Sequence, residues 1–421
     1  MNKQTKKNRR ALSGPFRVPS PRRAYFLKGG IAVVSVLLAA LLLVVAIRIP
    51  SPPPPSGRES AHPPAATVYR PTEKWLQRAY AIDVLFHQVY TPCWEGAYGA
   101  IGDAHLFAVT GDSALLRFYT VSHPLTEMCR QTWIDDQAWV CLAEMYWWRF
   151  TGKTNSIWVA DAVRRYTEYR DSGGLSHHEG FWSWYNFPPN TAPGQEQIFT
   201  NSNMNQMATV ACWLYEVTRE RHFLDDALLV WNGDRLTPGI ERTYYRGNGR
   251  WVGKSGLAAF GNPLPWMGAG YCSIAGALYR VTGEEKYRRI AVATAKRVMD
   301  PSTGWVDPAD FYQIRMDGNG AFVHFLLDAY QMAPDELKEI PGKVEKSLEY
   351  VWTNAHGKAT VVLHRESDHG IRNGWNGRGG EDGYRVGEVG TVHAQGEAVR
   401  AFGLYVYVTN VVIPRTSGVR K

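Results

Sequence analysis

The segment LYRVTGEEKYRRIAVA (278–293) contains the phrase that decides the fold. Before Thr282, apolar residues recur at intervals of three and four, which predicts an amphipathic helix. These residues are Tyr271, Ile274, Leu278 and Val281. Gly283 suits the C-cap of that helix, and the acids that follow suit the first turn of another. The segment is therefore predicted to join two helices as an αα-hairpin.

Copies of this phrase recur along the chain, each one an apolar run, a Thr-Gly-like turn and a second apolar pattern. Supersecondary units repeated in this way stack on one another and bury a shared core. The full copies are LFAVTGDSALLRFY (106–119), WWRFTGKTNSIWVADA (147–162) and LYEVTRERHFLDDALL (214–229). A degenerate copy is DAYQMAPDELKEI (328–340), and a half-copy is LYVYVTN (404–410).

The spacing of the copies indicates a closed ring. The first four turn threonines are separated by about 41, 67 and 64 residues, whereas an open solenoid keeps a regular period. Strand-like alternation is almost absent, and residues 360–363 are its best candidate. Long loops rich in Gly, Pro and Trp separate the hairpins, at 171–202, 245–267, 300–319 and 355–390. We therefore predict an all-α domain, an (α/α)6 toroid of helical hairpins whose loops surround a cleft at one mouth.

The N-terminal part of the chain predicts a membrane anchor. Residues 1–28 carry nine Lys and Arg and no acid, which is more than the whole net charge of +8. The rest of the chain is therefore nearly neutral, and the net charge does not indicate a nucleic-acid partner. GGIAVVSVLLAALLLVVAI (29–47) is uncharged and nearly long enough to span a hydrocarbon core of about 30 Å. Because positive charge stays on the cytoplasmic side, we expect a cytoplasmic tail at 1–28, a transmembrane helix at 29–49 and an extracellular or lumenal domain. A cleaved signal peptide is the alternative, although the residues after the apolar run make a poor cleavage site.

The rest of the chain divides into a linker, a folded domain and a tail. Residues 50–67 are rich in Pro and favour extended polyproline geometry, which makes them a stiff spacer. The folded domain is predicted at 68–414, with a basic tail at 415–421. The chain contains 16 Trp, 22 Tyr and 15 Phe, enough to fill a large core or to line a groove that stacks on sugars. The sequence does not indicate an oligomeric state.

The five cysteines predict neither a metal site nor another cofactor. They show no CxxC spacing and no zinc-ligand pattern. Cys93 and Cys129 lie in loop-like stretches, where an oxidising compartment would allow a bridge. The other three, Cys141, Cys212 and Cys272, lie inside apolar helical patterns and are predicted to be small buried side chains.

Chemistry is predicted at two adjacent acids in QTWIDDQAWVCLAEMYWWRF (131–150). An apolar stripe makes this segment a helix, with Asp135 and Asp136 in its first turn. One interpretation is structural, because Thr132 and Asp135 resemble a capping box and both acids complement the helix dipole. The other is catalytic, because Trp133 and its neighbours surround the pair with apolar surface. Glycoside hydrolysis with retention needs two carboxyls about 5–5.5 Å apart, one ionised and one protonated.

WIDDQAWVCLAEMYWWRFTG (133–152) resembles the Asp-Asp segment of glycoside hydrolase family 76, the endo-α-1,6-mannanases. Four further segments resemble the family in the same order. They are HHEGFWSW (177–184), NSNMNQMATVACWLYEVT (201–218), NGAFVHFLLDAY (319–330) and VHAQGEAVRAFGLY (392–405). The family's Lys and Arg in the fourth of these five segments are Asn319 and His324 here, and Ser183 splits its paired aromatics. The chain therefore resembles a divergent member.

The resemblance implies a retaining double displacement, with Asp135 as nucleophile and Asp136 as general acid/base. It also implies Trp182 and Trp184 as sugar platforms and Gln137 as a polar contact beside the pair. The other substrate-binding candidates are Trp133, the helix residues Asn203 and Asn205, and the loop residues Trp266, Asp307 and Trp375.

We expect a membrane-anchored glycoside hydrolase that cleaves α-1,6-linked mannose chains, either mannan or a mannose-containing wall or GPI glycan. Two alternatives remain open. One is a transglycosidase, which uses the same carboxyls and transfers the glycan to a second sugar. The other is a catalytically inactive (α/α)6 scaffold that binds polysaccharide.

Overall fold

The computed structural model describes residues 73–128, 133–178, 180–184, 205–252, 265–303, 306–311, 319–354, 360–361, 365–366 and 390–416. The chain divides into two compact units, Met1–Thr67 and Val68–Lys421, and all described residues belong to the second. The predicted cytoplasmic tail, transmembrane helix and linker lie outside the described residues. Among the helices that are described, none combines the length and the apolar character that crossing a bilayer requires.

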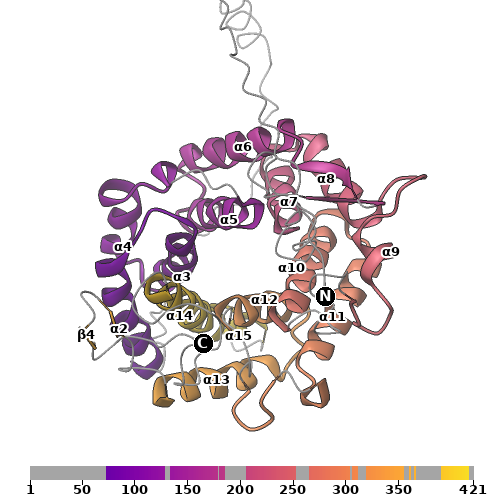
Figure 1. The fold of residues 1–421 in the computed structure, drawn as a ribbon. Coiled ribbons are helices and arrows are strands. Elements are labelled where there is room, and N and C mark those ends of the chain that lie inside the picture. The colour runs from indigo at the N-terminus through magenta and orange to yellow at the C-terminus, as the bar shows by residue number, and fades with distance from the viewer. Residues whose placement is uncertain are drawn as a thin grey trace, which may run out of the picture. The chain divides into compact units, whose positions relative to one another are not determined.

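The described helices of the second unit form two concentric rings (Figure 1). Each helix of the inner ring contacts the next along the chain, and the last one closes on the first. The inner helices are α3 (Trp94–Thr110), α5 (Ile134–Phe150), α7 (Gln206–Thr218), α10 (Pro265–Thr282), α12 (Asn319–Met332) and α14 (Gly390–Tyr407). The mostly helical toroid predicted from the repeated phrase is confirmed in this part of the chain.

The outer ring packs around these helices and completes the hairpins. Its members are α2 (Glu73–Val89), α4 (Ser113–Arg117) with the π-helix η1 (Phe118–Ser122), α6 (Ser156–Asp171), α8 (Arg221–Asn232), α11 (Glu285–Val298) and α13 (Ile340–Asn354). Shorter helical elements are η2 (Leu125–Glu127), α9 (Ile240–Tyr244), η4 (Pro301–Thr303), η6 (Val408–Val412) and α15 (Ile413–Thr416).

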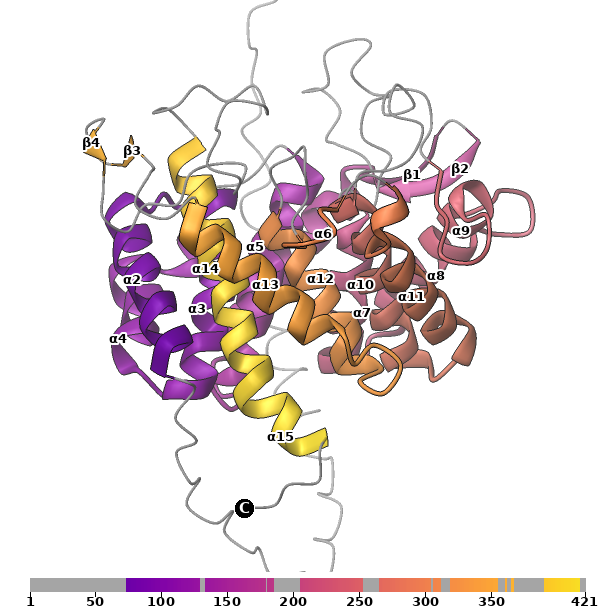
Figure 2. The same ribbon diagram turned by 90° about the horizontal axis from the view of Figure 1, so that it is seen from below.

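The Thr-Gly turns join the inner helices to outer helices, as the sequence predicts. Gly111 follows α3 and Gly283 follows α10, both in the left-handed conformation, with φ of 66° and 72°. In the third copy Arg219 adopts the same conformation in place of glycine, with φ of 63°. These turns all lie at the C-terminal ends of inner helices. The inner helices therefore begin at the opposite end of the ring, and Figure 2 shows α14 running from that end towards α15.

Ring closure depends on glycines where α3 meets α14. A Cβ on Gly102 would overlap the carbonyl oxygen of Val399, and one on Gly403 would overlap that of Gly102. Gly396 is similarly close to the backbone of Glu95. The contacts advance together along both helices, so α3 and α14 run parallel at backbone contact.

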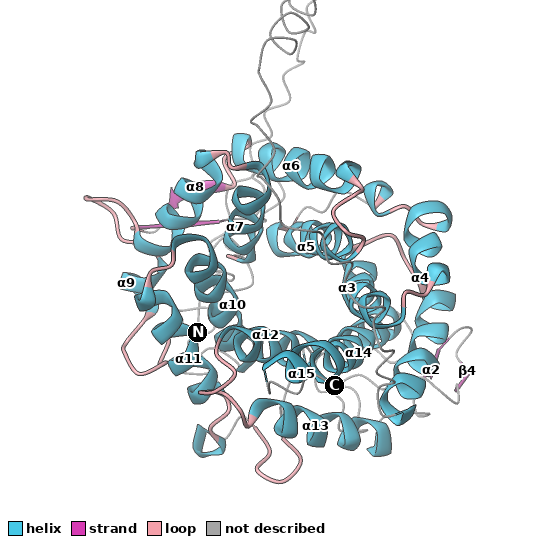
Figure 3. Cartoon of the chain, turned by 180° about the vertical axis from the view of Figure 1, so that it is seen from behind, coloured by secondary structure: helices cyan, strands magenta, loops and turns pink. Residues whose placement is uncertain are grey.

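Two short β-hairpins lie outside the helical rings. Strands β1 (Leu175–His178) and β2 (Phe181–Trp184) pair antiparallel, with Leu175 opposite Trp184, and β2 contacts α8 and α9 (Figure 3). This hairpin lies within the predicted loop 171–202 and was not predicted, because four-residue strands show too little alternation. Strands β3 (Thr360–Val361) and β4 (Arg365–Glu366) also pair, so the prediction of a strand within 360–363 is confirmed for its first two residues.

Aromatic side chains fill the space between the rings. Trp139, Trp147 and Trp231 are completely buried. Cys141, Cys212 and Cys272 are buried too, as predicted, and burial raises the pKa of each thiol. The composition allowed the tryptophans either to fill a core or to line a groove. Trp139, Trp147 and Trp231 belong to the core.

The glycine contact predicts a measurable cost for one methyl group. In Gly102→Ala the new Cβ meets backbone that cannot move aside, so we expect a loss of about 1–3 kcal/mol in the free energy of unfolding. The matched control is Gly342→Ala in α13, where nothing lies within 4 Å of the added Cβ, and helix propensity favours Ala by up to about 1 kcal/mol. Urea unfolding of the full chain measures both. Equal stability of the two variants would contradict the role given to this contact.

Candidate active site

Asp135 and Asp136 lie in the first turn of α5, at the mouth where the inner helices begin. Both side chains are half-buried. The N-cap is Trp133, in an extended conformation and without a side-chain capping bond, and Thr132 lies outside the described residues. The backbone N–H of Asp136 donates to Asp135 Oδ1 at 3.1 Å. The start of the helix thus supplies a donor to Asp135, and its dipole favours an ionised carboxylate there.

Two tyrosines flank the acid pair, Tyr98 from α3 and Tyr169 from α6. Burial is the main cause that raises the pKa of both phenols, and the charges of Asp136 and Asp135 add to it. Tyr169 donates a hydrogen bond to the backbone oxygen of Trp133, at 3.4 Å. Both phenols are therefore held neutral within range of the charges of Asp135 and Asp136.

The start of α14 adds a buried His-Glu pair that the sequence did not single out. Glu397 Oε2 accepts from the backbone N–H of Ala321 in α12 at 2.7 Å, and Oε1 lies 3.5 Å from His393 Nε2. Burial opposes the charge of Glu397, but His393, Arg400 and the Ala321 N–H together lower the pKa of its carboxyl. The spacing of four residues between His393 and Glu397 is a signal that was available in VHAQGEAVRAFGLY (392–405).

Arg400 continues this polar line along the axis of the ring. It is completely buried, and its Nε donates to His324 Nδ1 at 2.7 Å. The guanidinium group lies 4.4 Å from the ring centroid of Trp139 and 4.9 Å from that of Tyr98. Burial lowers the pKa of Arg400, while Glu397 opposes the shift. His324, noted as a departure from the family pattern, is therefore an internal partner of Arg400.

A cavity of about 440 Å³ lies beyond this line, lined mostly by residues of the C-terminal halves of the inner helices. Its polar lining includes Tyr146, Arg149, Arg280 and Asp328. This is the mouth opposite to Asp135 and Asp136. Parts of the long loops predicted to wall the cleft at the acid pair, 185–204, 253–264, 312–318 and 367–389, lie outside the described residues.

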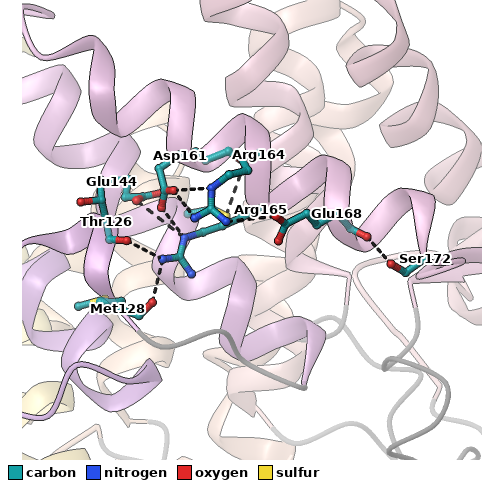
Figure 4. A network of polar contacts seen from close by, with 10 residues as sticks. Thr126, Met128, Glu144, Asp161, Arg164, Arg165, Glu168 and Ser172 are labelled. Carbon is teal, nitrogen blue, oxygen red and sulfur yellow. Dashed lines mark hydrogen bonds and ion pairs between the residues drawn. The ribbon is translucent and has the colours of Figure 1, made fainter. Parts of the chain in front are cut away.

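A buried ionic network fixes the outer face of α5 (Figure 4). Arg165 of α6 donates to Asp161 at 2.6 Å and to the backbone oxygen of Met128 at 2.8 Å. Glu144 of α5 lies 4.0 Å from Arg165, and burial, with Asp161 beside it, raises the pKa of Glu144 well above its usual range. The network ties α5 to α6 and to the turn that precedes the acid pair.

The predicted aromatic platforms lie on β2, against the outer helices. Trp184 is completely buried, and its ring packs against Tyr166 of α6 with centroids 5.3 Å apart. A ring without exposed surface presents no face to a sugar, so its burial conflicts with the platform role. Trp182 is half-buried, and its indole N–H donates to Asp234, at 2.8 Å, in the segment that follows α8.

The remaining substrate-binding candidates are placed as follows. Gln137 is buried within α5. Asn205 is buried before α7, where Oδ1 accepts from Ser183 Oγ at 3.1 Å and from the Trp184 N–H at 3.3 Å, so it joins β2 to α7. Asp307 Oδ1 accepts from the N–H groups of Ala309 and Asp310 and thus closes its own turn. Asn203, Trp375 and the side chain of Trp266 lie outside the described residues.

Comparison with known proteins finds similar folds among solved structures and no match through the sequence. No protein-family model and no curated protein matches the chain. The α-1,6-mannanase of Salegentibacter sp. HEL1_6 superposes with a TM-score of 0.57 at 16% identity, over 79% of this chain and 99% of the other. A family 76 glycoside hydrolase (mannosidase) from Bacteroides thetaiotaomicron gives 0.59 at 14% identity, over 80% and 99%. Dfg5 from Chaetomium thermophilum, in complex with glucosamine, gives 0.55 at 14% identity, over 80% and 90%.

These superpositions cover nearly the whole length of each relative and agree with the family that the sequence motifs resemble. The superpositions establish the fold. At identities of 14–16% they do not establish the reaction, which must be argued from the site. The chain therefore carries the fold of glycoside hydrolase family 76 structures in a divergent sequence.

Proposed function

We propose that this chain is a retaining glycoside hydrolase that cleaves α-1,6-linked mannose chains. The observation that carries the proposal is the placement of Asp135 and Asp136. They are adjacent, half-buried, and in the first turn of an inner helix, at the mouth where the inner helices start. In the Salegentibacter α-1,6-mannanase, a variant with two adjacent aspartates replaced by alanine is inactive and is found in complex with α-1,6-mannotetrose. That enzyme and this chain share the fold and an adjacent pair of acids.

The roles of the two acids follow from their surroundings. Asp135 accepts the N–H of Asp136 at the helix start, which favours its ionised form and suits a nucleophile. Asp136, beside that charge and the phenols of Tyr98 and Tyr169, is assigned the proton. Asp136 donates the proton to the glycosidic oxygen while an Asp135 oxygen bonds to C1 and the C1–O bond breaks. Asp136 then takes a proton from water, whose oxygen displaces Asp135 from C1.

The proposal also includes the membrane anchor. The apolar run 29–47 follows nine positive charges and precedes a Pro-rich spacer. We place the catalytic domain on the extracellular or lumenal side of a membrane, held there by residues 29–49. The substrate is then a polymer or glycan that reaches that surface.

Replacement of either acid tests the catalytic assignment. In Asp135→Asn or Asp136→Asn we expect turnover of α-1,6-mannan by the full-length chain to fall by roughly 10²–10⁴-fold, with substrate binding retained. Reducing-end release and binding to immobilised mannan are the two measurements. Wild-type turnover in both variants would contradict the assignment, and a wild type that binds mannan without turning it over would indicate the inactive scaffold.

The chain contains a matched control for this experiment. Asp225 and Asp226 repeat the dipeptide on the outer helix α8. Asp225 is exposed and pairs with Arg221. Asp226 is buried and bonds to Tyr166 and Arg170. Asp225→Asn should leave turnover and binding unchanged.

The stereochemistry of the first product tests the double displacement. Two inversions at C1 give net retention, so ¹H NMR of a fresh digest should show the α-anomer before mutarotation. Prompt appearance of the β-anomer would remove the nucleophile role from Asp135. Products longer than the substrate would indicate transfer to a sugar hydroxyl and thus the transglycosidase.

Removal of the apolar run tests the anchor. The full-length chain should remain in the membrane pellet after alkaline carbonate extraction, whereas a variant without residues 1–49 should be released, since it lacks the continuous apolar run 29–47. Release of the full-length chain by carbonate would refute the anchor, and a shortened N-terminus on the mature chain would indicate a cleaved signal peptide.

A further inference from the structure

Three potential ligand atoms converge in the first hairpin, between α2 and α3. Asp83 and His87 are one turn apart on α2, and Asp103 faces them from α3. His87 Nε2 lies 3.2 Å from Asp83 Oδ1 and 3.0 Å from Asp103 Oδ2, and the three ligand atoms all lie within 4.8 Å of one another. This cluster has no contact with the acid pair of the proposed function among those the structure describes.

Hydrogen bonding alone does not satisfy the cluster. Asp83 is 2% exposed and Asp103 has no exposed surface, and within the part of the chain that the structure describes Oδ1 of each carboxyl makes no hydrogen bond. A single imidazole nitrogen carries at most one proton, so His87 Nε2 can donate to only one of the two oxygens beside it. Among the described residues, His87 is the only ion-pair partner of either carboxyl. Burial of two acids with one neutral or singly charged partner is unfavourable unless the two carboxyls share a proton or a cation, and a cation would join all three groups.

The surroundings hold two of the three side chains in place. The Tyr119 hydroxyl donates to Asp103 Oδ2 at 2.6 Å, the kind of outer contact that fixes a carboxylate ligand. The His87 ring stacks on Phe118, with centroids 3.7 Å apart and planes 8° apart. Phe118 and Tyr119 both belong to the π-helix η1, a conformation often found at functional sites.

Two of the three separations are close to the edges of a tetrahedral metal site, and the third, between Asp83 and Asp103, is within 4.8 Å. Zinc binds His nitrogen and carboxylate oxygen at about 2.0–2.2 Å, which separates neighbouring ligand atoms by about 3.3–3.5 Å. The separations of 3.0 and 3.2 Å around His87 Nε2 need to widen by only a few tenths of an ångström. The side chain of His87 is 20% exposed, which leaves an entry path for an ion.

We propose that Asp83, His87 and Asp103 form a binding site for a divalent transition metal, with Zn²⁺ as the fitting ion. One imidazole nitrogen and two carboxylate oxygens are ligands that zinc accepts, with water in the fourth position. The role is structural: the ion ties α2 to α3, the helix on which α14 closes the ring. The sequence predicted no metal because its cysteines show no zinc spacing. His87 follows Asp83 by 4 residues and precedes Asp103 by 16, so the three ligands come together only when α2 and α3 pack as a hairpin.

Zinc titration of the full-length chain tests the site. After treatment with a chelator and dialysis, calorimetric titration with ZnCl₂ should show one equivalent bound, and Zn²⁺ should raise the unfolding temperature by several degrees. Asp83→Asn and Asp103→Asn should each lose this equivalent and the temperature shift. Both variants remove a buried charge and keep the side-chain shape, so without zinc they should be at least as stable as the wild type.

Two further variants separate the metal site from general effects. Tyr119→Phe keeps the three ligands and loses the orienting hydroxyl, so it should still bind one equivalent, roughly 10–100-fold more weakly. Asp225→Asn removes an exposed acid and should bind as the wild type does. The proposal is overturned if the wild type binds no zinc, which would leave a proton shared by the two acids. It is equally overturned if Asp83→Asn and the wild type bind the same amount. Neither result depends on mannan turnover, so failure here is distinct from failure of the glycosidase.

Discussion

Direct backbone contact between α3 and α14 is the constraint on which the rest of this fold depends. A ring of hairpins closes only if its last inner helix meets its first, and here they meet across Gly102, Gly396 and Gly403 without side chains between them. The two helices lie nearly 300 residues apart in sequence, so closure carries a loop entropy that many local contacts must offset. Glycine weakens a helix, and it is retained here because the approach leaves no room for a Cβ.

Closure also decides where charge gathers. Since the inner helices share one direction, their N-termini meet at a single mouth, and their dipoles make that mouth favourable for anions. Asp135 and Asp136 lie in this field, and Glu397 accepts an N–H from the start of α12. The same field that stabilises an ionised nucleophile opposes a proton on its neighbour. A second carboxyl that keeps its proton here therefore needs the adjacent charge of Asp135 and the low polarity around the Tyr98 and Tyr169 rings.

Behind the mouth, the ring holds ionic groups that a hydrophobic core of the same size would not need. Arg400 is buried, and two of its guanidinium nitrogens make no hydrogen bond to any residue that the structure describes. Aromatic faces and the Nδ1 of His324 compensate it only in part. Buried pairs of this kind seldom add net stability and more often fix geometry. Arg165 also fixes geometry, on the outer side of α5. It donates to the backbone oxygen of Met128, in the segment that precedes the acid pair.

The sequence by itself determined the helical hairpins, because the period of apolar residues and the Thr-Gly turns are local signals. It also placed Asp135 and Asp136 in the first turn of a helix. It did not reveal that Trp184 and Asn205 are internal, because burial depends on which distant helix covers a side chain. Nor did it bring together His393, Glu397 and Arg400 with His324, or Asp83 and His87 with Asp103. Only the tertiary structure decided these groupings, since their members meet through packing between helices, and side chains far apart in sequence carry no local mark of their partners.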